Sequence, residues 1–159
     1  MKRRLYDALE FKGELLFMSW DSSLETGIEL IDNQHRELVE AVENNILTST
    51  DEKALNSFNS TLNFLETYVL QHFSDEEEYQ KSSGYPDYHI HKSLHSDLIQ
   101  DLNEIKNQID REGISPELVN SINQFLLDWV MHHISKADFE FGKYYKKWKK
   151  DLSLTNSVN

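Results

Sequence analysis

The sequence predicts an all-α protein: an antiparallel up-down-up-down four-helix bundle with an N-terminal arm and a short C-terminal helical segment. Apolar residues recur at steps of three and four along four long segments, which is the period of an amphipathic helix. Only two prolines and five glycines interrupt the 159 residues, and short connections between long amphipathic helices favour antiparallel packing. We expect a single domain, residues 1–159, divided into an arm (1–30), a bundle (31–138) and a C-terminal segment (139–159).

The first two predicted helices carry histidines on their apolar faces. The stripe of the first helix consists of Ile31, His35, Leu38, Val42 and Ile46. The stripe of the second helix consists of Leu55, Phe58, Leu62, Leu65, Val69, His72 and Glu76. Glu76 is the one acid of its cluster that stays in register with the stripe, so we expect it to face the core. Its neighbours Asp75, Glu77 and Glu78 are expected to face solvent.

Turn and capping residues delimit the third and fourth helices. The sequence "SSGYPD" (82–87) separates the second helix from the third and offers Asp87 as an N-cap. Gly113 ends the third helix, and Ser115 followed by Pro116 begins the fourth. The third stripe consists of His91, His95, Leu98, Leu102, Ile105 and Ile109. The fourth stripe consists of Leu118, Ile122, Phe125, Leu126, Trp129 and His133.

Five of the seven histidines continue these apolar stripes. A single histidine on such a face is usually a hydrogen-bonded core residue. Five of them, spread over all four stripes, would each need a partner or cost roughly 1–3 kcal/mol as a buried polar group. A shared metal site removes this cost and would use His35, His72, His91, His95 and His133. His89 and His132 fall outside the centres of the stripes and are interpreted as peripheral.

Two carboxylates share the spacing of these histidines. Residues four apart lie on one helix face, which joins His91 to His95 and His72 to Glu76. Asp138 follows His133 by five residues, about 140° around an ideal helix. Both therefore reach one site only if the helix ends or bulges between them. The chain has no cysteine, so nitrogen and oxygen are the only strong metal donors.

Five imidazoles and two carboxylates are too many ligands for one tetrahedral zinc ion, and they suit two ions. If both carboxylates and a solvent-derived oxo or hydroxo group bridge the ions, three nitrogens complete six coordination on one ion. Two nitrogens leave the other ion five-coordinate, with one open position. Imidazole-rich ligation fits iron among the redox metals, while copper and zinc stay open by ligand type alone.

Four motifs together resemble the hemerythrins, and most closely the single-domain bacterial ones. The resemblance covers about residues 18–140 and rests on four quoted motifs. They are "WDSSLETGIELIDNQH" (20–35), "HFSDEE" (72–77), "SGYPDYHIHKSLH" (83–95) and "DWVMHHISKAD" (128–138). The resemblance implies two iron ions with a bridging oxo or hydroxo group. It assigns His35 and His72 to the five-coordinate iron, His91, His95 and His133 to the six-coordinate iron, and Glu76 and Asp138 to the bridges.

The resemblance also implies an apolar oxygen pocket beside the open iron. Its lining would consist of Leu38, Phe73, Trp129, Val130 and Ile134. Val130 departs from the leucine expected at that position, which puts the autoxidation rate in doubt. For each of these residues, packing in the core remains an equal alternative to a role in gas binding.

The function that follows is reversible dioxygen binding, as a carrier, a store or a supplier, and not enzymatic turnover. The main alternative is a diiron enzyme acting on oxygen, nitric oxide or peroxide. No histidine of this chain has the Glu-x-x-His spacing of the ferritin-like oxidases. An oxygen sensor acting through a separate partner is a further alternative. Other small diatomics or anions could occupy the open iron, and the sequence does not decide the oligomeric state.

Charge and hydropathy limit the other partners. The formal net charge is −12, which disfavours nucleic acid and anionic membrane surfaces. No stretch approaches the length of a membrane span. Acids interrupt the basic start of the chain before an apolar run forms, so we expect no signal peptide and a cytoplasmic protein.

The two ends of the chain lie outside the bundle motifs. Residues 141–150 interleave five lysines with tyrosine and tryptophan, which fits either docking on an acidic partner or nucleic acid, or a terminal helix packed on the bundle. We favour the packed helix, with its lysines facing water. Residues 1–19 would form either an added helix on the bundle or an oligomer contact, and their sequence does not decide.

Overall fold

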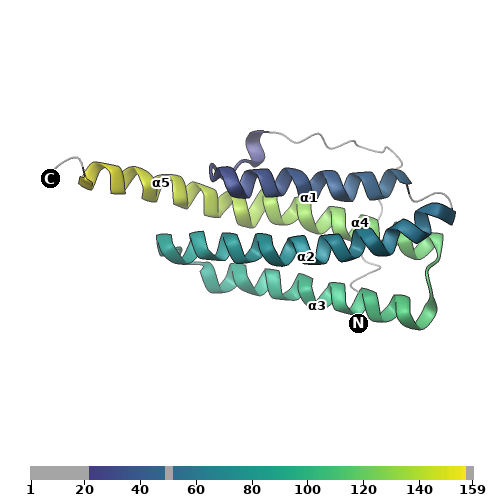
Figure 1. Ribbon diagram of the computed structural model, residues 1–159. Coiled ribbons are helices and arrows are strands. Elements are labelled where there is room, and N and C mark those ends of the chain that lie inside the picture. The colour runs from purple at the N-terminus through teal and green to yellow at the C-terminus, as the bar shows by residue number, and fades with distance from the viewer. Residues whose placement is uncertain (1–21, 49–51, 157–159) are drawn as a thin grey trace.

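The structure is a computed structural model that describes residues 22–48 and 52–156 (Figure 1). A short 3₁₀ turn, η1 (Ser22–Leu24), leads into helix α1 (Glu29–Thr48). Helices α2 (Glu52–Ser83), α3 (Tyr88–Glu112) and α4 (Pro116–His133) follow. A π-helical turn, η2 (Ile134–Asp138), joins α4 directly to α5 (Phe139–Asn156). The described residues contain no strand.

Helices α1 to α4 lie side by side and form the predicted antiparallel four-helix bundle (Figure 1). Its main core is made by apolar residues from all four helices, including Leu38, Phe58, Leu98 and Ile122. They belong to the stripes that the sequence predicts, so the amphipathic period and the packing agree. Helix α1 begins at Glu29, two residues before the predicted start of the bundle. The side chains of Ile46 and Leu55 lie outside those that the structure describes.

The helix ends agree with the capping and turn residues of the sequence, with one exception. Gly113 adopts a φ of 76° at the end of α3, and its N–H donates to the carbonyl of Ile109 at 2.8 Å. The Ser115 hydroxyl accepts a hydrogen bond from the N–H of Leu118 at the start of α4. Asp87 occupies the N-cap position of α3, but its side chain makes no capping hydrogen bond. The predicted cap is therefore right in place and wrong in mechanism.

The chain enters α1 through a tight polar loop. The Asp32 carboxylate accepts hydrogen bonds from the N–H groups of Thr26 (2.7 Å) and Gly27 (3.0 Å) and from the Thr26 hydroxyl (2.8 Å). Gly27 adopts a φ of 82°, which glycine tolerates without strain. Helix α5 packs on this loop so closely that a Cβ at Gly142 would lie 2.6 Å from Cα of Thr26. The loop and α5 therefore hold each other in place.

Helix α5 packs aromatic side chains on one end of the bundle. The helix then extends past that end (Figure 1). Phe141 and Tyr145 are buried with Ile28 and Ile31, and the Tyr144 hydroxyl donates to the carbonyls of Ser83 and Gly84. This arrangement agrees with the expectation of a terminal helix packed on the bundle.

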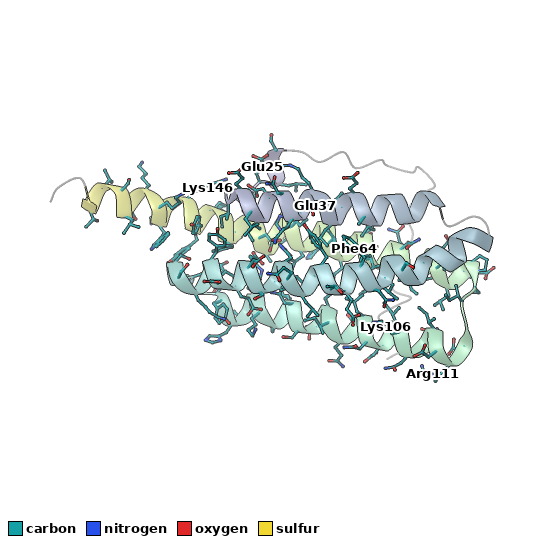
Figure 2. The ribbon with its side chains drawn as sticks, viewed as in Figure 1. Glu25, Glu37, Phe64, Lys106, Arg111 and Lys146 are labelled. Atoms are coloured by element: carbon teal, nitrogen blue, oxygen red, sulfur yellow. The ribbon has the colours of Figure 1, made fainter. Side chains whose placement is uncertain are left out.

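The lysines of α5 are exposed, as that expectation requires. Lys146 reaches back to the carbonyl of Glu25 at 3.1 Å (Figure 2). The expectations for residues 1–19 lie outside the described residues. No helix in the described part of the chain has both the length and the apolar character that a membrane crossing needs.

Candidate metal centre

All seven predicted ligands converge inside the bundle, although each helix contributes only one or two. His35 comes from α1, and His72 and Glu76 come from α2. His91 and His95 come from α3, His133 ends α4, and Asp138 ends η2. Every one of these side chains is buried. The donor atoms form two groups, each with its atoms within 4.8 Å of one another, and Asp138 belongs to both groups.

The π-helical turn explains how Asp138 reaches the site. In a regular α-helix, a residue five positions after His133 would point about 140° away from it. The wider turn over Ile134–Asp138 rotates Asp138 back, so its Oδ1 lies 3.0 Å from Nε2 of His133. The predicted bulge is therefore present, and π-helical turns of this kind frequently mark functional sites.

The larger group gathers three imidazoles around two carboxylates. Nε2 of His133 lies 3.2 Å from Nε2 of His91 and 3.0 Å from Nε2 of His95. Oε2 of Glu76 lies 3.2 Å from Nε2 of both His91 and His95, and Oδ1 of Asp138 lies 3.1 Å from Nε2 of His91. The five donor atoms thus face one small central volume.

The smaller group holds two imidazoles and shares one carboxylate with the larger group. The rings of His35 and His72 lie 4.8 Å apart, edge to face. Oδ2 of Asp138 lies 3.0 Å from Nε2 of His35, whereas its Oδ1 faces His91 and His133. One carboxylate therefore directs a separate oxygen to each group, which is the arrangement that a bridge between two ions needs.

The carboxylates lack the hydrogen bonds that would stabilise them in the metal-free protein. Glu76 and Asp138 are completely buried, and none of their four oxygens makes a well-aligned hydrogen bond with the described residues. Taking a carboxylate out of water costs several kcal/mol unless a cation lies close to its oxygens. A cation between these oxygens and the imidazole nitrogens removes that penalty, so the donor set fits a metal site.

Electrostatics keep the acids ionised and two of the imidazoles neutral. Although burial raises it, the pKa of Glu76 falls to about 2 because His91 and His95 face its carboxylate. Burial likewise opposes ionisation of Asp138, yet His133 and the other facing imidazoles hold its pKa well below the usual value. Burial and the neighbouring His35 lower the pKa of His72 to about 3, and burial lowers that of His95. Although burial lowers it, the facing carboxylates of Asp138 and Glu76 raise the pKa of His91 to about 10. Metal binds anionic oxygens and neutral nitrogens, so an ion at this site would displace the proton of His91.

A glutamine fixes which nitrogen of His72 faces the centre. The Gln34 amide donates from Nε2 to Oδ2 of Asp75 at 2.7 Å. Because an ionised carboxylate only accepts, the amide oxygen of Gln34 is turned to His72, at 3.0 Å from Nδ1. Nδ1 of His72 must then carry the proton, and Nε2 presents its lone pair to the centre.

Glu77 orients His95 in the same way as Gln34 orients His72. The expectation that Glu77 faces solvent is therefore wrong. Glu77 is buried instead of facing solvent. Its Oε1 lies 3.3 Å from Nδ1 of His95, and its Oε2 accepts from Nζ of Lys92 at 2.5 Å. Asp75 is half-buried and bound to Gln34, while Glu78 is exposed as expected. No periodic signal marks Gln34 or Glu77, because only the packing of neighbouring helices brings them to His72 and His95.

The five residues predicted to line an oxygen pocket are buried or half-buried near the centre. The ring of Phe73 stacks on His95 at 3.7 Å, and that of Trp129 stacks on His133 at 4.4 Å. Leu38 and Phe73 belong to the main core, whereas Val130 and Ile134 pack with Val39 in a smaller cluster. Trp129 contacts both clusters. Their role in gas binding stays a prediction.

His89 and His132, which were expected to be peripheral, are exposed. The adjacent residues His132 and His133 thus differ sharply in environment, since the latter is buried in the centre. The apolar periodicity of α4 therefore distinguishes the candidate ligand His133 from its exposed neighbour His132.

Comparisons with known proteins agree with this geometry. A sequence model of the hemerythrin HHE cation-binding domain matches residues 26–145. A myohemerythrin of Theromyzon tessulatum is 30% identical over 122 residues, which cover 77% of this chain and 88% of that protein. A bacteriohemerythrin of Clostridium acetobutylicum is 28% identical over 126 residues, covering 77% and 96%.

A solved structure has the same fold. The crystal structure of a wild-type hemerythrin superposes with a TM-score of 0.70 at 23% identity, covering 81% of this chain and 98% of that one. The family match spans most of the chain, including all seven converging side chains. This protein belongs to the hemerythrin HHE cation-binding domain family.

Proposed function

We propose that this protein binds dioxygen reversibly at a non-heme diiron centre held by His35, His72, Glu76, His91, His95, His133 and Asp138. The observation that carries the proposal is the position of Asp138. Its two oxygens face different histidine groups, at 3.0 Å from His35 and at 3.0 Å from His133. Two ions bridged by one carboxylate fit this placement, whereas one ion would leave part of the donor set unused.

The unequal histidine count supports an open coordination position. Three imidazoles, two bridging carboxylates and one bridging oxo or hydroxo group would complete six coordination on one ion. The two imidazoles of His35 and His72 would leave the other ion with one position vacant. Two ferrous ions held by these residues would supply the two electrons that reversible dioxygen binding requires.

The polypeptide would keep this position dry and the ligands oriented. Leu38 and Phe73 follow the ligands His35 and His72 closely in sequence, and both are buried. With Trp129, Val130 and Ile134, they would exclude water from the site. Gln34 would hold His72 with its Nε2 lone pair toward the ion.

We infer that the protein acts as an oxygen carrier, store or supplier in the cytoplasm. The donor set of five imidazoles and two carboxylates, all buried, supports binding of a small gas at a metal pair. Other small diatomics or anions would compete with dioxygen for the vacant position.

The test is metal content and an absorption spectrum before and after air. Purified protein loaded with ferrous iron under anaerobic conditions should hold two ions per chain. It should gain visible charge-transfer bands in air and lose them under vacuum. The matched variants are His133→Leu, which removes a buried ligand, and His132→Leu, which removes its exposed neighbour.

His133→Leu should lose iron and the spectral response, whereas His132→Leu should behave as the parent does. A spectrum that air leaves unchanged would refute the oxygen-binding proposal. Equal metal content in the two variants would refute the proposed ligand set.

A further inference from the structure

Two ligands of the centre are supported by chemically different groups. Nδ1 of His72 faces the neutral amide oxygen of Gln34 at 3.0 Å. Nδ1 of His95 faces the carboxylate of Glu77 at 3.3 Å. An acceptor on the outer nitrogen of an imidazole raises the electron density on its metal-binding nitrogen, and a carboxylate does so more strongly than an amide.

A cation on the far side of Glu77 limits this donation. The carboxylate divides its oxygens, so that Oε1 faces His95 and Oε2 accepts from Nζ of Lys92 at 2.5 Å. The Tyr88 hydroxyl also donates to Oε2, at 3.4 Å, and Nζ of Lys81 lies 3.9 Å from it. The Glu77 side chain is only 9% exposed, whereas that of Lys92 is 47% exposed. The anion is therefore held close to His95, and its strongest counter-charge reaches in from the surface.

We propose that the Glu77–Lys92 pair sets how strongly His95 donates electrons to its metal ion. The charge of Glu77 stabilises the higher oxidation state at the three-histidine position, and Lys92 moderates that effect. Gln34 gives His72 no comparable charge. Glu77 and Lys92 are positioning residues that act through His95, and the redox part of this inference rests on the proposed diiron function.

The two partners of this pair should have opposite effects when each is removed. Glu77→Gln removes the negative charge but keeps an oxygen that accepts from His95. Lys92→Gln removes the moderating positive charge and leaves Glu77 in place. Both variants break the same ion pair, so a purely structural role predicts changes in the same direction. An electrostatic role predicts opposite shifts in the equilibrium between ferric and ferrous ion.

The matched control is Glu78→Gln, which removes the same charge at the next position. Glu78 is exposed at the surface of α2. All variants should show the far-UV circular dichroism of the parent before they are compared. The control separates the effect of losing one charge anywhere on the chain from the effect of losing the Glu77 charge beside His95.

Two measurements test the inference. In the first, Co²⁺ binding by metal-free protein should weaken about 10-fold in Glu77→Gln, and it should tighten in Lys92→Gln. In the second, a mediated titration of iron-loaded protein measures the gain of one electron per ferric ion. Glu77→Gln should shift this equilibrium about 10-fold toward ferrous ion, which is about 59 mV for one electron. Lys92→Gln should shift it toward ferric ion.

The outcomes separate this inference from the proposed function. Shifts in the same direction for Glu77→Gln and Lys92→Gln would overturn the inference, as would values for Glu77→Gln that match those of Glu78→Gln. If the parent fails to bind oxygen while Co²⁺ affinities still separate the variants as expected, the inference stands and the oxygen proposal fails.

Discussion

The packing of α5 can be tested by two phenylalanines that lie two residues apart on it. Phe141 is completely buried, with its ring 5.2 Å from Tyr85 and 5.8 Å from Tyr145. Replacing a buried phenylalanine with alanine costs about 3–5 kcal/mol, because apolar transfer energy is lost and a cavity remains. We expect Phe141→Ala to lower the free energy of unfolding by that amount.

The matched control is Phe139→Ala at the start of the same helix. Phe139 is 38% exposed, and it lies under Nζ of Lys143 at 5.4 Å. An exposed cation–π contact contributes about 0.5–1 kcal/mol, so this substitution should cost roughly 1 kcal/mol. Both variants have the same composition and lose the same side chain.

Urea denaturation of metal-free protein, followed by far-UV circular dichroism, measures both costs. A difference of about 2–4 kcal/mol between the two variants, with similar m-values, would support the packed position of α5. Equal and small losses would refute it, because the aromatic face of α5 would then contribute nothing to the fold.

Three further predictions concern a cap, a tyrosine and the metal. Ser115→Ala should lower the free energy of unfolding by about 1 kcal/mol, because α4 loses its N-cap, and urea denaturation measures this loss. Burial raises the pKa of Tyr85 from 10.0 to about 12. The folded protein therefore binds more protons than the unfolded chain between these pH values, so stability should fall as pH rises through that range. The urea midpoint measures this loss of stability, and in Tyr85→Phe the midpoint should fall less over the same pH range. Removing metal with a chelator should lower the melting temperature, since a ligand at 100 times its Kd stabilises by about 2.7 kcal/mol. A melting curve that chelation leaves unchanged would contradict a metal site in the folded protein.

Helical periodicity is enough to predict which candidate ligands share a face within a regular helix. His91 and His95 share a face because they are four residues apart, and the same holds for His72 and Glu76. Asp138 could be connected to His133 only by requiring a bulge, and the π-helical turn supplies it. Periodicity fails for Glu77, because its environment depends on how α2 packs against α3 and not on its position along α2.

The residues that hydrogen-bond to the histidines of the centre are harder to predict from the sequence for the same reason. Gln34 lies 41 positions from Asp75, yet their side chains share a hydrogen bond. Lys92 lies 15 positions from Glu77. Such pairs follow from helix rotation and register in the folded bundle, which hydrophobic spacing constrains only coarsely. Asp87 shows that residue type and position can also predict too much. Both fit an N-cap, but the Asp87 side chain makes no capping hydrogen bond.

Helix α4, the turn η2 and helix α5 follow one another without a break, so the candidate ligands His133 and Asp138 lie on the same backbone segment as the last helix. His133 and Asp138 sit in the middle of one helical rod whose far end extends beyond the bundle (Figure 1). Gly142, four residues after Asp138, lies close against the backbone of Thr26, which fixes α5 on the bundle just beyond the turn. The π-helical turn sets the angle between Asp138 and His133, and it also sets the direction in which α5 continues. One local feature of the backbone therefore governs both the placement of the donor atoms and the course of the last helix.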